Sequence, residues 1–597
     1  MAKNINIKID GITVSVPEGT TILEAARQLN IQIPTLCYHE DLCIAGNCRV
    51  CVVELKGART LPASCAMPVS EGMDVLTNTL KVRTARKHII ELLLSEHNAQ
   101  CTTCYKNGKC ELQDLASEYK ISNGETFIDL VPSKNYQIDS YSPSIIKDDS
   151  KCIRCQRCVR TCEELQHVSA LGVAYKGDKM KISTFFENPM FEVVCTNCGQ
   201  CVNRCPTGAL IERNYIDQVW DAIYDENTHV VVQTAPAVRV ALGEDLGIET
   251  GEIVTGKMVT ALKRLGFNSV LDTDFTADLT IIEEGNELLT RLKRALVDKD
   301  PSVRLPMATS CSPGWIKFIE HTYPEYLDNL STCKSPQQMF GALAKTYYAQ
   351  KRKIDPAKII SVSIMPCTAK KFEADRPEMR SSGYKDVDFV LTTRELAVMI
   401  KQAGLDFGKL PESDFDSIMG QSTGAAVIFG ATGGVMEAAL RTAYEVVTGR
   451  EVPFDDLNIT PVRGMDGVRE AAVTISGTKP EWSFLEGATL KTVVAHGLVN
   501  AKKVMDSVRD GKADYHFIEI MACPGGCLGG GGQPVPTNKE IREKRAKAIY
   551  QEDAGKPIRK SHENPEIIGI YAEFLKEPLG HKSHELLHTH YKARQRY

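Results

Sequence analysis

The sequence predicts a multidomain α/β protein, and three observations support this fold class. The chain has 597 residues, which is enough for several domains with separate cores. From about residue 225 onward, short apolar runs rich in β-branched residues alternate with helical stretches, as in layered α/β folds. Most of the 21 cysteines, by contrast, lie before residue 206 at short, repeated spacings. We therefore expect small cysteine-rich modules followed by one large α/β domain.

Composition narrows the class of protein. The net charge of −5 and the 25% of charged residues suggest neither a nucleic acid nor an anionic membrane as a partner. No apolar run approaches the ~20 residues that span a bilayer, and the first residues, MAKNIN, do not resemble a signal peptide. These features predict a cytoplasmic protein. In such a chain, closely spaced cysteines predict metal sites rather than disulfides.

Residues 1–79 form the first predicted module. Apolar and polar residues alternate on both sides of Asp10-Gly11, which predicts a β-hairpin, and Thr21 with Glu24 forms a capping box before a helix. A loop with four cysteines follows, namely Cys37, Cys48, Cys51 and Cys65. Four thiolates suit two irons or one zinc ion, and we favour a [2Fe–2S] cluster because only one pair is tightly spaced. We interpret Cys43 as a plain loop thiol.

Residues 80–120 form the second module. An amphipathic helix predicted at residues 82–94 leads to one histidine and three cysteines, which are His97, Cys101, Cys104 and Cys110. This set can hold zinc or a [4Fe–4S] cluster, and its local spacing does not decide between them.

Residues 140–215 contain the run Cys-x2-Cys-x2-Cys-x3-Cys twice. The run is typical of bacterial ferredoxins with two [4Fe–4S] clusters, in which the fourth cysteine of each run ligates the other cluster. Cluster A would then be held by Cys152, Cys155, Cys158 and Cys205. Cluster B would be held by Cys162, Cys195, Cys198 and Cys201.

Residues 225–535 form the predicted α/β domain. Strands are expected at residues 230–233, 268–271, 303–307, 359–364 and 515–520, and a helix at residues 277–297. The last three strands each precede a cysteine segment: TSCSPGW (309–315), MPCTAKKFE (365–373) and EIMACPGGCLGGG (519–531). Open α/β sheets bind ligands at the carboxyl ends of their strands. We therefore expect Cys367, Cys523 and Cys527, with one group from the first segment, to surround a soft metal cluster. Three buried structural thiols are the alternative.

Two further stretches complete the chain. The Gly-rich stretch at residues 424–435 carries neither G-x-G-x-x-G nor G-K-[ST], so it predicts close helix packing rather than a nucleotide loop. Residues 536–597 form a polar tail with helices expected at residues 539–550 and 565–574. Four histidines crowd near its end, His581, His584, His588 and His590. They could hold a metal, but we favour a solvated terminal segment.

The three cysteine segments resemble the signatures of the [FeFe]-hydrogenase family, which are TSCCPxW, MPCxxKxxE and ExMxCxxxCxxGG. The second and third match at every specified position, and the first differs at one. The first two modules resemble that family's β-grasp [2Fe–2S] ferredoxin and its one-histidine, three-cysteine [4Fe–4S] module, which are also found in complex I. The tail resembles the family's small subunit.

The resemblance implies an H-cluster, in which a [4Fe–4S] cubane is bridged through one cysteine to a di-iron unit with CO, cyanide and a dithiolate. Cys367 and Cys523 would ligate the cubane, and Cys527 would be the bridge. With one [2Fe–2S] and three accessory [4Fe–4S] clusters, the chain would hold roughly 20 iron atoms.

The resemblance also implies roles for side chains around the cluster. Cyanide would accept hydrogen bonds from Lys370, from Gln337 and from the backbone near Ala235 and Pro236. Met365 and Met521 would line the cavity, although ordinary core packing explains them as well. A proton path would consist of Cys311, Glu284, Glu287, Ser331 and Arg291. From the residues alone, the two carboxylates would be interpreted as a solvated helix face, and Lys370 as a surface lysine.

The first segment departs from the family pattern of two adjacent cysteines, of which the first passes protons and the second ligates the cubane. Here Cys311 holds the relay position and Ser312 the ligand position. Either Ser312 binds through oxygen, a harder donor than thiolate, or Cys311 shifts to ligate and the relay is lost.

We therefore expect a cytoplasmic iron hydrogenase that reversibly oxidises H2 and reduces protons. No NAD or flavin site is evident in the sequence, so the expected partners are a diaphorase-like NAD(P)/flavin subunit and a small [2Fe–2S] subunit and/or a ferredoxin. The alternatives are an H2 sensor and a complex I-like electron-transfer subunit without an H-cluster.

Overall fold

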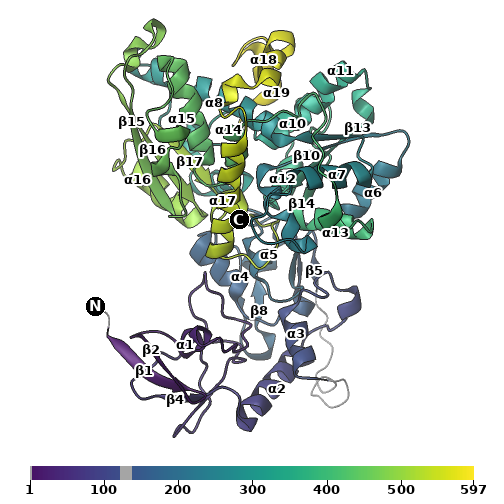
Figure 1. Ribbon diagram of the computed structural model, residues 1–597, viewed down its shortest axis with the longest axis vertical. Coiled ribbons are helices and arrows are strands. Elements are labelled where there is room, and N and C mark those ends of the chain that lie inside the picture. The colour runs from purple at the N-terminus through teal and green to yellow at the C-terminus, as the bar shows by residue number, and fades with distance from the viewer. Residues whose placement is uncertain (1–2, 122–136, 597) are drawn as a thin grey trace.

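The computed structural model describes residues 3–121 and 137–596, which form a lower lobe of small modules and an upper α/β lobe (Figure 1). The lower lobe begins with a four-stranded sheet of order β2-β1-β4-β3. Its strands are β1 (Asn4–Ile9), β2 (Ile12–Pro17), β3 (Glu54–Leu55) and β4 (Asp74–Leu76). The predicted hairpin is the antiparallel pair β1–β2, and the predicted capping box begins α1 (Ile22–Gln28). Alternate residues of β1 are buried against α1, so this module has its own core.

The rest of the lower lobe has short elements. The predicted amphipathic helix is α2 (Leu80–Ser95), and α3 (Glu111–Glu118) follows Cys110. The two-cluster domain contains β5 (Ile138–Asp139), β6 (Ile145–Asp148), α4 (Arg157–Arg160), β7 (Gly172–Ala174), β8 (Lys181–Ser183), α5 (Gln200–Arg204) and β9 (Leu210–Glu212). Its buried core consists of aliphatic residues, a methionine and four cysteines, so predicted metal ligands form part of this core.

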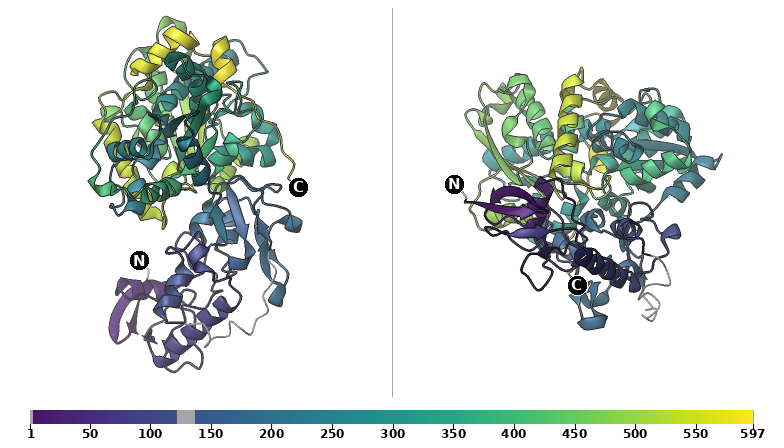
Figure 2. Two further views of the ribbon diagram at one scale, coloured as in Figure 1. Left: turned by 90° about the vertical axis from the view of Figure 1, so that its right-hand side faces the viewer. Right: turned by 60° about the horizontal axis from the view of Figure 1, so that its bottom comes forward.

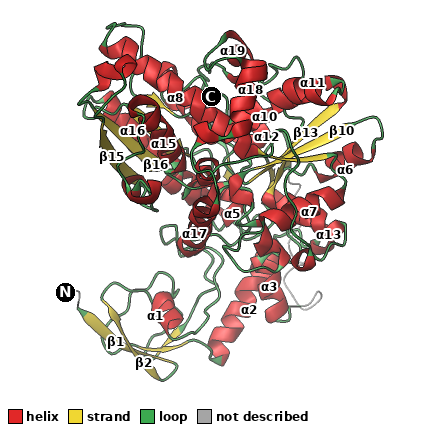
Figure 3. Cartoon of the chain, turned by 45° about the horizontal axis from the view of Figure 1, so that its top comes forward, coloured by secondary structure: helices red, strands yellow, loops and turns green. Residues whose placement is uncertain are grey.

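Two sheets form the upper lobe. The first is parallel, has the order β11-β10-β13-β14, and consists of β10 (His229–Thr234), β11 (Ser269–Asp272), β13 (Ile359–Met365) and β14 (Phe389–Thr392). The second has the order β12-β17-β16-β15, with β12 (Met307–Ala308), β15 (Val468–Thr474), β16 (Thr489–His496) and β17 (Phe517–Met521). The two sheets lie on opposite sides of the lobe, and helices surround both (Figures 1 and 3). The three cysteine segments therefore come from two different sheets.

Helices enclose these sheets. They are α6 (Ile216–Tyr224), α7 (Thr255–Leu265), α8 (Thr273–Leu296), α9 (Pro313–Thr322), α10 (Pro336–Leu343), α11 (Ala349–Arg352), α12 (Ala369–Ala374), α13 (Thr393–Gln402), α14 (Gly424–Val427), α15 (Gly434–Thr448) and α16 (Leu498–Arg509). The tail adds α17 (Lys539–Gly555), α18 (Pro565–Ile570) and α19 (His581–Leu587). In Figure 1, α17 lies between the two sheets. No helix among the described residues is long and apolar enough to cross a membrane.

The two lobes meet through the two-cluster domain. The left view of Figure 2 shows its blue segments at the junction, while the purple β1–β2 hairpin lies away from the upper lobe. Gln200 donates a hydrogen bond to the carbonyl of Gly529 (2.8 Å), and Asn203 donates one to Gly530 (2.9 Å). The accessory metal sites are therefore joined directly to the segment that carries Cys527.

Three predictions need correction. The strand expected at residues 303–307 is reduced to β12, which begins at Met307, because Pro306 has no N–H to donate to a strand ladder. Helix α8 begins at Thr273 rather than at residue 277, since the carboxylate of Asp272 accepts the N–H of Asp274. The tail is not wholly solvated: His588 is only 8% exposed, whereas the other three tail histidines are exposed.

Candidate active site

A cavity lies where the cysteine segments of the two sheets converge. It brings together the residues predicted to surround the H-cluster, which are Ala235, Pro236, Cys311, Ser312, Gln337, Met365, Cys367, Lys370, Met521, Cys523 and Cys527. Pro336, Phe429 and several backbone segments complete a mainly apolar wall. An enclosed apolar cavity with a few converging polar groups is the usual form of a cofactor site.

Strand ends and helix starts position these groups. Cys367 lies between the end of β13 and the start of α12, and Cys523 follows β17. Ser312 is the N-cap of α9, with Pro313 at the first helical position, where its missing N–H costs no hydrogen bond. The positive end of the α9 dipole therefore faces the cavity, which favours an anionic group there.

Glycines let the segments approach one another closely. A Cβ atom at Gly530 would lie 2.0 Å from the carbonyl oxygen of Pro366, and one at Gly531 would lie 2.2 Å from that of Cys198. Both positions are wedged between backbones, so only glycine fits. The run of glycines after Cys527 is thus a packing requirement of the site.

The cavity wall contains polar groups that fit an anionic ligand. Lys370 Nζ donates to the carbonyl of Cys311 (3.1 Å) and to Glu373 Oε2 (2.9 Å), so Lys370 is not a surface lysine. Gln337 Nε2 donates to Glu373 Oε2 (3.1 Å), while Gln337 Oε1 is buried without a partner among the described residues. Buried polar atoms are rarely left unpaired, so this side chain fits a site that receives a polar group. A buried cation and thiols around one cavity likewise suit an iron cluster with anionic ligands.

Cys311 and Ser312 face different neighbours. Ser312 Oγ accepts the backbone N–H of Ala522 (3.2 Å), which places it beside Cys523. Burial raises the pKa of the Cys311 thiol well above its usual value, and the charge of Glu284 raises it further. Glu284 is thus close enough to influence the Cys311 thiol, whereas the Ser312 hydroxyl lies next to the segment of Cys523, one of the predicted cubane ligands.

Three of the predicted proton-path residues, Glu284, Glu287 and Ser331, are buried, while Cys311 and Arg291 are half-buried. Glu284 is 3% exposed, and burial raises its pKa to about 8. The carboxylate of Glu287 accepts hydrogen bonds from Arg291 Nη2 (2.6 Å) and from Ser331 Oγ (3.2 Å). Arg291 and Ser331 also line a pocket that opens beside the group. The interpretation of these carboxylates as a solvated helix face is therefore wrong.

The structure also brings together the four accessory sets. The first set consists of four buried cysteines, Cys37, Cys48, Cys51 and Cys65. The distance between the Sγ atoms of Cys51 and Cys65 is 3.3 Å. In the second set, the pKa of His97 is lowered by burial, and its buried Nδ1 has no partner among the described residues, as a metal ligand requires. Cys152, Cys155, Cys158 and Cys205 line one small cavity, and Cys162, Cys195, Cys198 and Cys201 line another.

Several groups at the site were not anticipated from the sequence. Cys198 lines both the cluster B cavity and the central cavity, so the two share a wall. Glu519 is fully buried and accepts the backbone N–H groups of Gly433 and Met436, both at 2.7 Å; burial raises its pKa to about 7. The position of Glu519 in the third signature could have drawn attention to it. No local pattern indicates the shared wall, because it joins segments more than a hundred residues apart.

Comparisons with known proteins agree with this geometry. Residues 228–531 match the model of the iron only hydrogenase large subunit, C-terminal domain, and residues 539–594 match that of the iron hydrogenase small subunit. The front of the chain matches a 2Fe-2S iron-sulfur cluster binding domain (2–80), the NADH-ubiquinone oxidoreductase-G iron-sulfur binding region (86–125) and the NADH-quinone oxidoreductase subunit 3, ferredoxin-like domain (142–211).

Relatives cover the whole chain. It is 53% identical to the NADP-reducing hydrogenase subunit HndD of Solidesulfovibrio fructosivorans, over 99% of both chains. It is 40% identical to iron hydrogenase 1 of Clostridium pasteurianum, over 98% of this chain and 99% of the relative. A solved structure of apo [FeFe]-hydrogenase HydA1 from Chlamydomonas reinhardtii covers 64% of this chain and 99% of its own, with 45% identity and a TM-score of 0.56. The chain therefore belongs to the [FeFe]-hydrogenase family, as a catalytic subunit with complex I-like iron–sulfur modules that acts on H2.

Proposed function

We propose that the central cavity holds the H-cluster on Cys367, Cys523 and Cys527, with Ser312 as the fourth group. When bound, this cofactor supplies the iron site at which H2 is split or formed. The observation that carries the proposal is that one cavity is lined by the three thiols, by Lys370 and by Cys311 at the head of a buried carboxylate group. The protein would position and enclose the cofactor and balance its charge. It would also conduct protons and electrons to and from the cofactor.

Ser312 is the better candidate for the fourth ligand of the cubane. Its hydroxyl lies beside Cys523, as the hydrogen bond from Ala522 shows. Cys311 instead has Glu284 as its strongest charged neighbour. A shift of Cys311 to the ligand position would turn its thiol away from that carboxylate and interrupt the relay.

The remaining wall would hold the anionic ligands of the di-iron unit. Lys370 Nζ is held by Glu373 Oε2 and the Cys311 carbonyl and keeps a third N–H, so it would not need to reorganise when the ligand binds. Gln337 would donate only after its amide group turned, because Nε2 already donates to Glu373 Oε2 and to the Lys370 carbonyl. Met365 and Met521 supply adaptable apolar contacts, and Ala235 and Pro236 supply backbone.

Protons would move from Cys311 through Glu284, Ser331 and Glu287 to Arg291 at the outer pocket. Each step needs a titratable or hydroxyl group within hydrogen-bond reach of the next. The bonds of Glu287 to Ser331 and to Arg291 meet this requirement at the outer end.

Electrons would pass through one [2Fe–2S] and three [4Fe–4S] clusters. One buried cluster of side chains contains Cys37, Cys48, Cys110 and Cys155, so three accessory sites lie against one another in an apolar setting. Cluster B adjoins the active-site cavity through Cys198. A redox route from the lower lobe would therefore end at the shared wall.

The electron partners would be separate subunits. We propose a diaphorase-like NAD(P)/flavin subunit and a small [2Fe–2S] subunit and/or a ferredoxin, since the relative from Solidesulfovibrio fructosivorans is called a subunit of an NADP-reducing hydrogenase. The cytoplasmic location stays a prediction from the sequence.

An infrared spectrum of the chain produced with the maturation proteins tests the proposal. We expect bands of metal-bound CO and cyanide, and H2 evolution from reduced viologen. A protein with its accessory iron complete but without these bands would carry no H-cluster, and its role would then be restricted to electron transfer. Bands without turnover would instead indicate an H2 sensor.

A further inference from the structure

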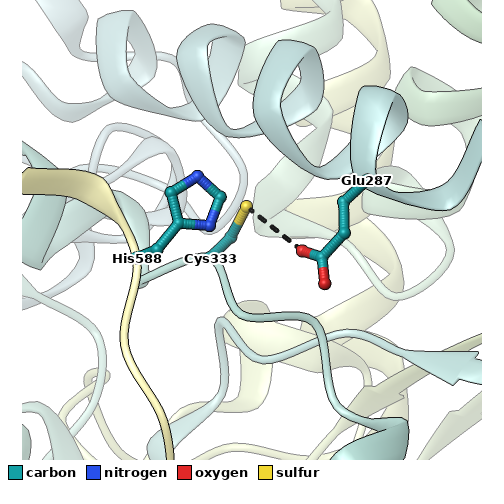
Figure 4. A group of neighbouring side chains, drawn as sticks. All are labelled: Glu287, Cys333 and His588. Atoms are coloured by element: carbon teal, nitrogen blue, oxygen red, sulfur yellow. Dashed lines mark hydrogen bonds between the residues drawn. The ribbon is translucent and has the colours of Figure 1, made fainter. Parts of the chain in front are cut away.

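We infer that Glu287, Cys333 and His588 form a zinc site beside the outer end of the proton route. The three side chains come from α8, from the segment before α10 and from the tail, and they point toward one another (Figure 4). All three are buried, and one ligand atom from each lies within 4.8 Å of the other two. This group lies outside every cluster site described above.

The donor set and spacing suit zinc. One sulfur, one imidazole nitrogen and one carboxylate oxygen are typical zinc ligands, and neighbouring ligands of a tetrahedral zinc ion lie roughly 3.5 Å apart. Cys333 Sγ is 4.0 Å from Glu287 Oε2. Thr332 Oγ1 lies 3.0 Å from that same oxygen and 2.8 Å from His588 Nδ1, so Nδ1 is the ring nitrogen on the carboxylate side. A small contraction of the side chains would bring the three donors to bonding distance.

A second carboxylate orients the histidine. His588 Nε2 lies 3.2 Å from Glu283 Oε2, and Glu283 is itself held by the Leu579 N–H (2.9 Å) and the Tyr571 hydroxyl. Metal-binding histidines usually donate their second ring N–H to a carboxylate in this way, which fixes the tautomer. His588 Nδ1 would then bind the metal in place of its present contact with Thr332 Oγ1. Glu283, which is fully buried, thus supplies an independent reason to regard the group as a metal site.

Charge and access are also compatible with a divalent cation. The Glu287 carboxylate and the Cys333 thiolate would balance the charge of Zn²⁺, and the thiol proton would leave to solvent as the metal binds. The pocket lined by Arg291, Ser331 and Thr332 offers an entry path and a water molecule for the fourth position. Zinc would displace Arg291, which is now bound to Glu287 (2.6 Å).

The effect on turnover rests on the proposed function. If Glu287 passes protons, a zinc ion that takes its carboxylate as a ligand would block the route. Bound zinc would therefore slow H2 evolution and oxidation alike, and removal by a chelator would restore both rates. The site itself does not depend on this consequence.

The test adds Zn²⁺ to the purified holoenzyme, removes unbound metal by desalting, and measures zinc and iron per chain together with the zinc X-ray absorption spectrum. We expect one retained zinc with one sulfur ligand and otherwise nitrogen or oxygen ligands, at unchanged iron content. Cys333→Ala and His588→Ala should each lower retention at least tenfold, and Cys333→Ala should abolish the sulfur ligand. The spectrum is element-specific, so the iron clusters do not obscure it.

Cys43→Ser is the matched control, because Cys43 is the other thiol outside the proposed cluster sites and is exposed. It should retain zinc as the unaltered chain does. The inference is overturned if the unaltered chain retains no zinc, if its zinc has no sulfur ligand, if Cys333→Ala keeps that ligand, or if zinc uptake matches iron loss. If zinc binds as expected but turnover does not change, the site stands and the relay role of Glu287 fails.

Discussion

At the scale of single residues, we propose different tasks for the adjacent positions Cys311 and Ser312, which are proton transfer and ligation of the cubane. The charge of Glu284 raises the pKa of the Cys311 thiol, while the Ser312 hydroxyl accepts the N–H of Ala522, next to Cys523. The sequence alone left open which of them completes the cubane, because both are possible ligands at adjacent positions. The answer depends on the direction in which each side chain leaves the turn before α9, which no local pattern encodes.

Replacing Ser312 with cysteine should alter the cubane rather than the fold. Thiolate is a softer donor than alkoxide and stabilises reduced iron better, so Ser312→Cys should raise the midpoint potential of the cubane by on the order of 100 mV. A redox titration followed by the infrared bands measures this shift. An unchanged potential would show that Ser312 is not a ligand.

Cys311→Ala is the companion variant. If Cys311 is the relay, this variant should keep its iron and its infrared bands while turnover falls by about a hundredfold or more. Loss of the cubane in this variant would instead place Cys311 in the ligand position.

Glu284 gives a prediction about pH. Burial raises its pKa to about 8, so the side chain is a neutral acid at pH 7 and ionises as the pH rises through about 8. A difference infrared spectrum should show a protonated-carboxyl band that disappears over that range and is absent from Glu284→Gln. The variant should also lose turnover by about a hundredfold or more. A band that persists in Glu284→Gln would belong to another group, such as Glu519.

At the scale of elements, the start of α13 joins three segments. Arg394 forms a two-pronged ion pair with Glu212 of β9 (2.7 and 2.9 Å). It also donates to the carbonyl of Gly531 (2.7 Å) and to Asn203 Oδ1 of α5 (2.9 Å). One buried guanidinium therefore holds together the two-cluster domain, the parallel sheet and the Gly-rich loop after Cys527 (residues 529–532).

Removing this cation should loosen the junction. Arg394→Met would leave Glu212 buried without its partner, which costs about 3–5 kcal/mol of stability at neutral pH. Thermal unfolding followed by loss of cluster absorbance measures the change. The double variant Arg394→Met with Glu212→Gln should recover part of the loss, because the unpaired charge is gone. Equal stability of the single and double variants would contradict this account.

The same pair has a defined pH dependence. Burial alone would raise the pKa of Glu212, but the charge and hydrogen bonds of Arg394 outweigh burial and hold it at about 2. Its stabilisation is therefore complete above its ordinary pKa of about 4.3 and is lost as the pH falls toward 2. The stability gap between the unaltered chain and Arg394→Met should therefore narrow as the pH falls. The narrowing should begin above about pH 4.3, where the unpaired buried Glu212 of the variant takes up a proton, and continue below it as the unaltered chain loses its stabilisation.

Regular elements were largely predictable from the sequence, and their exceptions have local causes. The β1–β2 hairpin, α1, α2, β10 and β13 follow from alternation, capping and apolar runs. The strand expected before Thr309 failed at Pro306, and α8 began early because of the cap at Asp272. The burial of His588 could not be predicted, since it depends on a bridge to Cys333 across more than two hundred residues.

At the scale of the whole molecule, the cysteine spacings predicted which residues form each accessory ligand set. They did not predict which of these sets lie next to one another. The cysteines predicted for cluster A line one cavity and those predicted for cluster B line another. This was predictable because both sets come from a repeated Cys-x2-Cys-x2-Cys-x3-Cys run. The common wall at Cys198 and the convergence of two sheets on one cavity arise from packing between distant segments. Such contacts are set by the fold as a whole.

Cluster B should be the electron connection to the active site. Cys201 lines the cluster B cavity but not the central cavity, so Cys201→Ala should remove cluster B and leave the central site intact. The iron content should fall by about four atoms per chain. The infrared bands of the H-cluster should remain, while turnover with a ferredoxin or with viologen should largely disappear. Cys43→Ser, at an exposed thiol, should change neither quantity. Full turnover in Cys201→Ala would show that electrons enter by another route.

The clamped Gly-rich loop has a consequence for biosynthesis. The residues after Cys527 accept hydrogen bonds from Gln200, Asn203 and Arg394, and the first two belong to the domain that we propose holds clusters A and B. A newly made chain without those clusters would lack the support for this loop. We therefore expect a fixed order of assembly, in which the accessory clusters are installed first and the catalytic cofactor is accepted last.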